Sequence, residues 1–491
     1  MTARCIMVLG TSSGAGKSWL TTALCRYYAR QGLKVAPFKA QNMSNNARVV
    51  AGPAGPGEIG SAQYFQALAA QAQPDVRMNP LLLKPEADTR SQVVLLGQVN
   101  SALSDTPWRG RSEMVWPHIA QAIDALRAEN DVVVIEGAGS PAEINLMDSD
   151  IVNLRVARHA DARCLLVTDI DRGGAFAHLY GTWALLPKAD QDRVAGFVLN
   201  KFRGDASLLA PGPEQLQALT GVPTVAVLPM WWQHGLPEED GVFDDRTRTG
   251  GVVERTVAVV AYPRISNLDE FQPLKNVPGL RLLWARSPAD VAGLTPQDWI
   301  ILPGSKHTSS DLAWLRQQGL DAAVTSHVQK GGAVLGICGG LQMLGEALID
   351  TDGIDGNAPG LGLLPLVTQF AEDKTVRETS ATFGQVYGVW GALSGVATRG
   401  YEIHHGQTQA HPAMLAAGAV LHEVMPGLAW QDASGQVLGT YLHGLFEQAE
   451  VLQALFGAKV PTLETVLDGL ADYVAQHFAP GTLPNLLGAS D

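Results

Sequence analysis

The sequence predicts an α/β chain in which a doubly wound domain with a phosphate-binding loop precedes a second α/β domain. Short apolar runs alternate with helical segments from residue 5 to residue 228, as in a parallel sheet covered on both faces. A Gly-rich loop joins the first apolar run to the first helical segment. A second alternating series begins at Thr256, and it includes a cysteine between a strand and a helix.

Composition and charge narrow the class of protein. The 491 residues are 46% hydrophobic, which is typical of globular chains, and they exceed what one compact core usually holds. A formal net charge of −13 argues against nucleic acid or an anionic membrane as a partner. The four cysteines lack metal or disulfide spacing, no apolar run is long enough for a membrane span, and the early first strand leaves no room for a signal peptide. We therefore expect a cytoplasmic protein.

A polar stretch divides the chain. Residues 235–251 are acidic and rich in glycine, so we interpret them as a linker. A first domain is expected at 1–234, a second at 252–450 and a C-terminal helical segment at 451–491. The sequence does not define an oligomeric state.

The loop that follows the first strand has the residues that phosphate binding requires. Backbone N–H groups of Gly14, Gly16 and the start of the helix can face phosphate oxygens. Lys17 can reach the β- and γ-phosphates, and the Ser18 hydroxyl can ligate Mg²⁺. The spacing from Gly10 is one residue longer than in the common P-loop. We expect ATP and Mg²⁺ as cofactors.

Polar residues also follow other predicted strands. Lys39, Gln41 and Asn42 lie in an amide-rich stretch after the strand at 34–38, where no regular structure is expected, and Lys84 lies in a proline-flanked run. We assign these four as candidate substrate contacts, because loops at the carboxyl ends of parallel strands usually face a ligand.

Two further strand ends suit nucleotide binding. Glu136 ends the buried strand that begins at Asp131, which is the Walker-B position, and we assign it with Ser18 to the metal; the alternative is a carboxylate that only caps a turn. Asn200 ends the strand at 196–199 and suits recognition of a nucleotide base. Its spacing to Asp205 does not match the guanine-specific pattern.

The second domain contains a predicted nucleophile elbow. Cys338 lies between a strand at 333–337 and a helix, and the small residues around it allow a sharp turn. The helix N-terminus favours the thiolate. N–H groups of Gly339 and of the Gly304–Ser305 turn are candidates for an oxyanion hole.

A nucleophilic thiolate needs a base, and His443 is the best candidate. It follows the strand at 437–442, where a Cys–His pair can be assembled. His404 and His405 are the competitors, but they lie within an alternating strand pattern. The other three cysteines are interpreted as structural.

Taken together, these motifs resemble a known family. Three runs in the second half are similar to a class I glutamine amidotransferase domain of the cobyrinate-amidating branch: Gly336–Gly345, Pro303–Lys306 and Tyr441–Phe446. The long P-loop resembles that of dethiobiotin synthetase. Four runs in the first half resemble the ATP-dependent amidoligase of the cobyric acid synthase family: Pro37–Ser44, Met78–Pro85, Asp169–Gly174 and Asn200–Asp205.

The resemblance implies amidation of four peripheral carboxylates (b, d, e and g) of adenosylcobyrinic acid a,c-diamide, with L-glutamine as nitrogen donor, to give cobyric acid. ATP would activate each carboxylate, and Cys338 would release ammonia. Ordinary triad glutaminases have Glu two residues after the histidine, where this chain has Leu445. We therefore expect a Cys338–His443 dyad, in which the backbone or another side chain orients His443, and do not assign Glu447 as a third member.

Three alternatives stay open. A sister enzyme of the same architecture amidates the a and c carboxylates. A partitioning-type ATPase has a variant P-loop but no need of the Cys338 elbow, and a non-enzymatic scaffold needs neither site.

Overall fold

The computed structural model describes residues 2–53, 55–87, 90–231, 234–236, 252–458 and 460–488. The chain divides into two compact units. Unit 1 consists of Met1–Ser44, Val50–Leu236 and Leu463–Asp491, and unit 2 consists of Asn45–Val49 and Pro237–Thr462. Apart from Gly235 and Leu236, the expected linker lies outside the described residues. The division differs from the expected one in two ways: a short early segment belongs to unit 2, and the C-terminal residues belong to unit 1.

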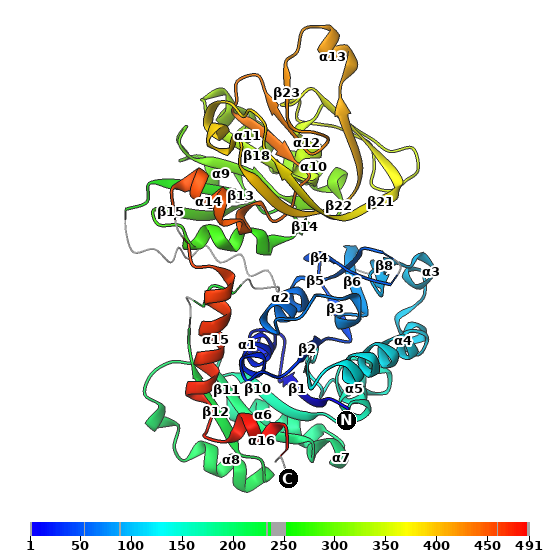
Figure 1. The fold of residues 1–491 in the computed structure, drawn as a ribbon, viewed down its shortest axis with the longest axis vertical. Coiled ribbons are helices and arrows are strands. Elements are labelled where there is room, and N and C mark those ends of the chain that lie inside the picture. The colour runs from blue at the N-terminus through cyan, green and yellow to red at the C-terminus, as the bar shows by residue number, and fades with distance from the viewer. Residues whose placement is uncertain are drawn as a thin grey trace. The chain divides into compact units, whose positions relative to one another are not determined.

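Unit 1 is built on a parallel sheet in the order β12-β11-β10-β1-β9-β2 (Figure 1). Its strands are β1 (Arg4–Gly10), β2 (Val35–Phe38), β9 (Val132–Glu136), β10 (Arg163–Asp169), β11 (Val194–Phe202) and β12 (Thr224–Pro229). Each strand coincides with an apolar run of the sequence, so the predicted doubly wound sheet is confirmed.

The sheet of unit 1 has a core on each face. Along β1, Met7 and Leu9 join one core while Ile6 and Val8 join the other, as the pleat of a strand requires. One face packs against α4 (Trp108–Glu129), α5 (Leu154–His159), α6 (Ala175–Leu185) and α8 (Gly212–Thr220). The other packs against α1 (Lys17–Arg30), α2 (Ser61–Ala69), α15 (Leu463–His477) and α16 (Thr482–Leu486).

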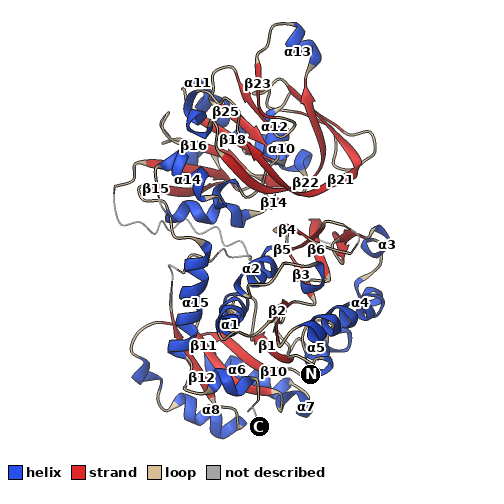
Figure 2. Cartoon of the chain, in the orientation of Figure 1, coloured by secondary structure: helices blue, strands red, loops and turns tan. Residues whose placement is uncertain are grey.

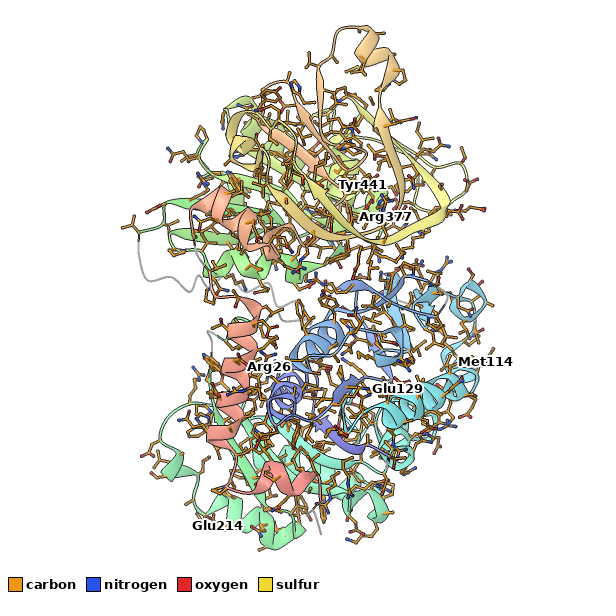
Figure 3. All side chains as sticks on the ribbon, viewed as in Figure 1. Arg26, Met114, Glu129, Glu214, Arg377 and Tyr441 are labelled. Atoms are coloured by element: carbon orange, nitrogen blue, oxygen red, sulfur yellow. The ribbon has the colours of Figure 1, made fainter. Side chains whose placement is uncertain are left out.

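The C-terminal helices complete unit 1. Arg26 of α1 is buried, and its Nε donates to Asp468 Oδ1 of α15 at 2.7 Å (Figure 3). Its Nη2 donates to Glu464 Oε2. The Tyr28 hydroxyl donates to the Leu483 carbonyl at 2.7 Å. The segment expected at 451–491 is thus divided, because α14 (Ala449–Phe456) belongs to unit 2.

Unit 1 also contains a smaller sheet of four strands. One of these strands lies where the sequence predicted irregular structure. The order of the sheet is β3-β6-β7-β8, formed by β3 (Gln41–Met43), β6 (Leu81–Ala87), β7 (Arg90–Leu95) and β8 (Gln98–Val99). The stretch after β2 was expected to be irregular, but Gln41–Met43 pairs in parallel with Leu81–Leu83. The remaining elements of this half are β4 (Ala47–Val50), β5 (Gly57–Gly60), α3 (Ser101–Ser104) and α7 (Lys188–Gln191).

Unit 2 has a second sheet in the order β15-β13-β16-β18-β25-β24-β23 (Figure 2). Its strands are β13 (Arg255–Val260), β15 (Leu280–Ala285), β16 (Trp299–Leu302), β18 (Ala333–Ile337), β23 (Leu421–Met425), β24 (Ala429–Asp432) and β25 (Val437–Thr440). The first five strands in this order are parallel, whereas β24 and β23 are antiparallel. The expected α/β arrangement of the second half is confirmed.

The other elements of unit 2 lie outside that sheet. The strands are β14 (Ile265–Ser266), β17 (Gly304–Ser305), β19 (Ala347–Ile349), β20 (Ala358–Pro359) and the long pair β21 (Leu366–Thr382) and β22 (Ala397–Ala410). The helices are α9 (Pro288–Val291), α10 (Thr308–Gln317), α11 (Leu320–Gln329), α12 (Gly339–Leu344) and α13 (Pro412–Ala416). A 3-10 segment, η4 (Leu268–Asn276), follows β14.

Candidate active site

The phosphate-binding loop of unit 1 is held by the end of β11. Gly16 has a φ of 98°, and a Cβ there would lie 2.0 Å from Asn200 Nδ2, so only glycine fits. Asn200 Nδ2 donates to the Ala15 carbonyl at 2.9 Å, and Lys201 Nζ donates to the Gly14 carbonyl at 2.8 Å. Asn200, predicted for a base, thus contacts the backbone of the loop.

A buried polar network lies where the loop, β2 and β9 end. Lys17 Nζ donates to the carbonyls of Ser12 and Gly139, at 2.9 and 3.1 Å. Around Glu136, the Ser18 hydroxyl lies at 2.7 Å and Lys39 Nζ at 2.8 Å from Oε1, and Gln66 Nε2 contacts Oε2. Three residues predicted from the sequence, Ser18, Lys39 and Glu136, are therefore joined in one network with Gln66, which was not predicted.

The electrostatics of this network keep Glu136 ionised. Burial alone would raise the pKa of the Glu136 carboxyl, but the Lys39 ammonium and the hydrogen bonds from Ser18 and Gln66 outweigh it and hold the pKa below its ordinary value. A carboxylate oxygen and a hydroxyl are ligands that suit Mg²⁺. Gln66 Oε1 and Gln41 Oε1 are buried with no hydrogen-bond partner in the protein, as expected of atoms that face a ligand. The donor set thus fits Mg²⁺.

In the part of the chain that the structure describes, no three His, Cys, Asp or Glu side chains are grouped to hold a metal. Mg²⁺ in nucleotide sites usually completes its coordination with phosphate oxygens and water.

Asn42 and Lys84, two further candidate substrate contacts, each bind a buried side chain of the protein. Asn42 Nδ2 donates to Gln63 Oε1 at 3.2 Å, and Lys84 forms an ion pair with Glu58. Lys84 and Glu58 are both buried, so their charges compensate each other. Lys84, like Lys39, therefore forms an ion pair with a carboxylate of the protein itself, and the sequence did not predict either pair.

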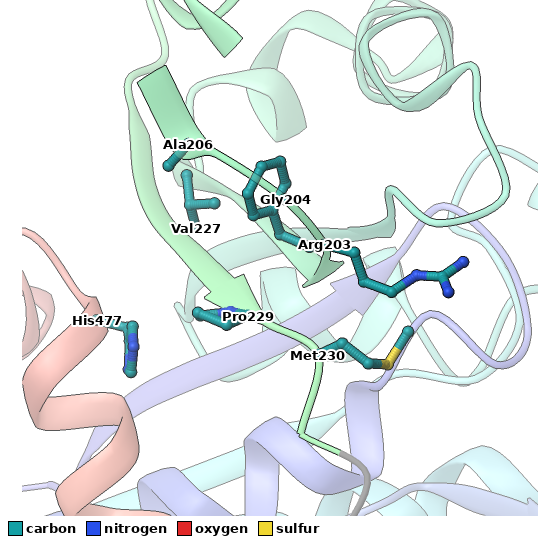
Figure 4. Close-up of a pocket in the computed structure, with 8 residues that line it drawn as sticks. Arg203, Gly204, Ala206, Val227, Pro229, Met230 and His477 are labelled. Atoms are coloured by element: carbon teal, nitrogen blue, oxygen red, sulfur yellow. The ribbon is translucent and has the colours of Figure 1, made fainter. Parts of the chain in front are cut away.

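A pocket of about 500 Å³ lies at the carboxyl ends of β11 and β12 (Figure 4). Its lining is mostly apolar and includes Phe202, Arg203, Val227, Pro229, Met230 and His477. Because β11 also provides Asn200, the pocket follows directly along the strand that holds the phosphate-binding loop. Such a position at the strand ends is where doubly wound sheets bind ligands.

In unit 2, Cys338 occupies a strained turn between β18 and α12. Its backbone has a φ of 51° and a ψ of −106°, a conformation that non-glycine residues rarely adopt. A Cβ on Gly340 would lie 1.8 Å from the Leu302 carbonyl oxygen, so the turn also needs glycine there. The Cys338 thiol lies 3.6 Å from the Ile403 carbonyl oxygen. It also forms a hydrogen bond with the His443 side chain.

The candidate oxyanion donors lie beside this pair. A Cβ built on Gly339 would lie 2.8 Å from the Ser305 backbone nitrogen, and one built on Gly304 would lie 2.9 Å from His443 Cε1. The structure thus brings Gly304, Ser305, Gly339, Cys338 and His443 together, as the sequence analysis expected of one site.

His443 is buried and held from several sides. Its Nδ1 lies 3.0 Å from Glu270 Oε1, and the Gly444 N–H donates to Glu270 Oε2 at 2.9 Å. The ring of Tyr401 stacks on the imidazole with centroids 5.2 Å apart and 17° between the planes. Hydrogen bonds between the backbones of Tyr401 and His443 fix that arrangement.

The tautomer of His443 follows from its neighbours. Asn267 Nδ2 lies 3.2 Å from the same Nδ1, but Asn267 Oδ1 already accepts a hydrogen bond from the Ala47 N–H. A carboxylate only accepts hydrogen bonds, so Nδ1 carries a proton and donates it to Glu270, and the Asn267 amide nitrogen, itself a donor, does not bond to the protonated Nδ1. This leaves Nε2 for the Cys338 thiol.

The group that orients His443, which the sequence left open, is a carboxylate that lies at Nδ1. Glu447 is not that carboxylate: it pairs with Arg48. The missed residue is Glu270, in the run Asn267–Glu270 soon after the first strand of unit 2. Two adjacent acids at the carboxyl end of a parallel sheet are the signal that could have found it.

The charge on Glu270 affects His443. Burial alone would lower the pKa of the imidazole, but the Glu270 carboxylate and the hydrogen bond to Cys338 raise it above its ordinary value. A charged imidazole next to a thiol favours the thiolate, which is the nucleophile.

Comparison with known proteins decides the family. Residues 6–233 match the family model of the CobQ/CobB/MinD/ParA nucleotide binding domain, and residues 256–451 match that of the CobB/CobQ-like glutamine amidotransferase domain. Over 488 residues, the chain is 75% identical to the cobyric acid synthase of Variovorax paradoxus, covering 99% of this chain and 100% of the relative. The chain belongs to the cobyric acid synthase family.

More distant relatives extend the comparison. The cobyric acid synthase of Leptothrix cholodnii is 64% identical over 503 residues, which cover 99% of this chain and 97% of the relative. A crystal structure of a glutamine amidotransferase aligns with 44% of this chain and 98% of its own, at 17% identity and a TM-score of 0.29.

Membership of the cobyric acid synthase family makes the chain a glutamine-dependent amidoligase that uses ATP. A partitioning-type ATPase and a scaffold do not account for its amidotransferase half. Within the described residues, no helix combines the length and hydropathy needed to span a bilayer.

Proposed function

We propose that the chain amidates the b, d, e and g carboxylates of adenosylcobyrinic acid a,c-diamide with ammonia from L-glutamine, giving cobyric acid. Unit 1 would activate the carboxylates and unit 2 would hydrolyse glutamine. The observation that carries this proposal is that one chain combines a phosphate-binding loop beside Lys39 and Glu136 with a strained cysteine beside a buried histidine. We place the reaction in the cytoplasm, where both ATP and L-glutamine are available.

In unit 2, the Cys338 thiolate would attack the side-chain carbonyl of glutamine. The oxyanion would accept hydrogen bonds from the N–H groups of Gly339 and Ser305. His443 would give a proton from Nε2 to the leaving nitrogen as the C–N bond breaks, so that ammonia departs and a thioester remains. Water would then hydrolyse the thioester to glutamate, with His443 taking the proton.

In unit 1, a substrate carboxylate would attack the γ-phosphorus of ATP, so that the bond to the β-phosphate oxygen breaks and ADP leaves. Lys17, the first residue of α1, would stabilise the transferring phosphoryl group. Mg²⁺, when held by Ser18 and Glu136, supplies positive charge that neutralises the phosphates. The resulting acyl phosphate would react with ammonia, and phosphate would leave as the amide forms.

The nucleotide base has a candidate site in the pocket at the ends of β11 and β12. Its apolar lining suits a flat heterocycle, and it continues the strand that contacts the loop through Asn200. Asn200 would act on the nucleotide through the loop backbone it holds rather than by reading the base.

The corrin substrate is large and apolar apart from its side chains. Met43, Ile144 and Leu146 are exposed, at 60%, 65% and 42%. Met43 follows Asn42, and the other two lie in the loop that follows Glu136. We assign them as apolar contacts of the corrin, since exposed apolar side chains at strand ends favour a ligand.

One experiment tests the proposal against its nearest alternative. Purified protein is incubated with ATP, Mg²⁺ and L-glutamine, and with either cobyrinic acid or adenosylcobyrinic acid a,c-diamide. We expect mass spectrometry to find four added amide groups on the a,c-diamide. Amidation of cobyrinic acid at the a and c positions, with no turnover of the a,c-diamide, would instead identify the sister enzyme.

A further inference from the structure

Residues 45–49 bring one buried arginine into unit 2. Arg48 is 2% exposed, and its guanidinium forms ion pairs with Asp269 and Glu447, with Nη1 at 3.0 Å from Glu447 Oε2. Asp269 precedes Glu270, the residue that bonds His443. Arg48 thus binds the residue that directly precedes Glu270, the acid at the catalytic imidazole.

The same guanidinium also lies over the ring that packs on His443. Its carbon is 4.9 Å from the centroid of Tyr401, a distance at which a cation is attracted to the ring face. Tyr401 in turn stacks on the imidazole. Arg48 therefore reaches His443 by two routes, through Asp269 and its neighbour Glu270 and through Tyr401.

The neighbours of Arg48 add two contacts to the same stretch of unit 2. The Ala47 N–H donates to Asn267 Oδ1, and Asn46 Oδ1 accepts from the Leu268 N–H, both at 3.0 Å. Three successive residues, 46–48, therefore bind three successive residues, 267–269, just before Glu270. Such a run of bonds fixes the backbone from which Glu270 projects.

Charge balance gives Arg48 a second effect. Asp269, Glu270 and Glu447 are three acidic residues close to one another, and Arg48 pairs with two of them. Glu270 and Cys338 act on the pKa of His443, and the imidazole is also faced by Tyr401 and Asn267. Removing Arg48 would take away a positive charge that pairs with Asp269 and Glu447, and the more negative surroundings would stabilise the imidazolium.

We propose that Arg48 is a positioning residue of the glutaminase centre, which fixes Glu270 and Tyr401 against His443 and balances the acidic groups around it. The centre is therefore completed by a segment more than 200 residues earlier in the sequence, at 45–49. This proposal rests on the proposed roles of Cys338 and His443.

The test compares full-length variants in a glutamine hydrolysis assay that measures glutamate. For Arg48→Met, we expect kcat to fall on the order of 10–100-fold with little change in KM, because the catalytic groups are displaced while glutamine binding is retained. We expect the pH–rate profile to move to higher pH, since the imidazolium is favoured. Arg48→Lys should recover part of the rate by restoring the charge.

The matched control is Arg26→Met in unit 1. Arg26 is also buried and also pairs with two carboxylates, Glu464 and Asp468. We expect this variant to lose thermal stability but to keep the wild-type kcat and pH profile of glutamine hydrolysis. If Arg48→Met behaves like Arg26→Met, or loses rate with an unchanged pH profile and no rescue by lysine, the proposal is overturned.

A second variant covers the case in which Arg48→Met does not fold. Glu447→Gln keeps Arg48 but removes one acidic group, so we expect the pH–rate profile to move to lower pH; an unchanged profile would contradict the charge-balance argument. Cys338→Ser separates this proposal from the one it rests on. Full glutaminase activity in Cys338→Ser overturns the catalytic pair, whereas a wild-type pH profile in Glu447→Gln with an inactive Cys338→Ser overturns only the role of Arg48.

Discussion

Glu270 and His443, 173 residues apart in sequence, form a buried pair in which the carboxylate lies 3.0 Å from Nδ1 of the imidazole. The same carboxylate accepts the N–H of Gly444, so both of its oxygens are engaged. Glu270 therefore lies where it can orient His443. In ordinary triad glutaminases, the corresponding acid is two residues after the histidine.

Replacement of that acid should be costly. For Glu270→Gln, we expect glutaminase activity to fall on the order of 10²-fold or more, because an amide can hold the wrong tautomer of His443. His443→Ala should lose on the order of 10²–10⁴-fold. Glutamate release by stopped assay measures both. Glu447→Gln is the matched control and should lose less than about tenfold; equal losses in Glu447→Gln and Glu270→Gln would show that Glu270 has no special role.

Cys338→Ser should abolish synthesis with glutamine but retain synthesis with added ammonium. Ammonia bypasses only the thioester step, and the amidation in unit 1 is unaffected. Product mass with each nitrogen source measures the effect. Cys164→Ser, at a buried cysteine of β10, is the control and should retain both activities. Glutamine turnover by Cys338→Ser would refute the nucleophile.

Lys17→Ala should remove synthesis with either nitrogen source, because both require the acyl phosphate. Cys338 should still react with a glutamine-like affinity label, which shows that unit 2 remains folded. Lys34→Ala provides the comparison, since Lys34 precedes β2 and lies on the surface. A wild-type rate with ammonium in Lys17→Ala would exclude a role in phosphoryl transfer.

The lowered pKa of Glu402 predicts that this carboxylate stabilises the folded chain in a pH-dependent way. Burial would raise the pKa of this carboxyl, but hydrogen bonds from His404, Arg377 and Thr379 lower it from 4.5 to about 2. Because the folded value is below the unfolded one, the stabilisation is full above pH 4.5 and is lost as the pH falls toward 2.

Glu402→Gln should therefore melt at a lower temperature than the wild-type chain at pH 7, and the difference should shrink as the pH is lowered from 5 to 3. Scanning calorimetry measures it. Glu378→Gln, at an exposed carboxylate on the same strand as Arg377, should show no such difference. A constant difference at all pH values would contradict the assignment of the shift to Glu402.

The fold could be predicted because buried strands of parallel sheets are continuous apolar runs, and these are visible without knowing their neighbours. Cys338 and His443 were also visible, since each is marked by local glycines and a preceding strand. Glu270 and Arg48 were not, because nothing in their local sequence shows which distant side chain they meet. Lys39 and Lys84 were found as polar residues near strand ends, but the pairing of each with a buried glutamate depends on tertiary structure.

The return of α15 and α16 to unit 1 has a consequence for the order in which the chain acquires structure during synthesis. Leu467, Leu470 and Val474 belong to the same core as Ile6 and Val8, yet the ribosome makes them last. A nascent chain that ends before them lacks one side of that core, although its first strands were completed hundreds of residues earlier. Unit 2 can thus complete its core while unit 1 still exposes apolar surface, a period in which chaperones would have their main use.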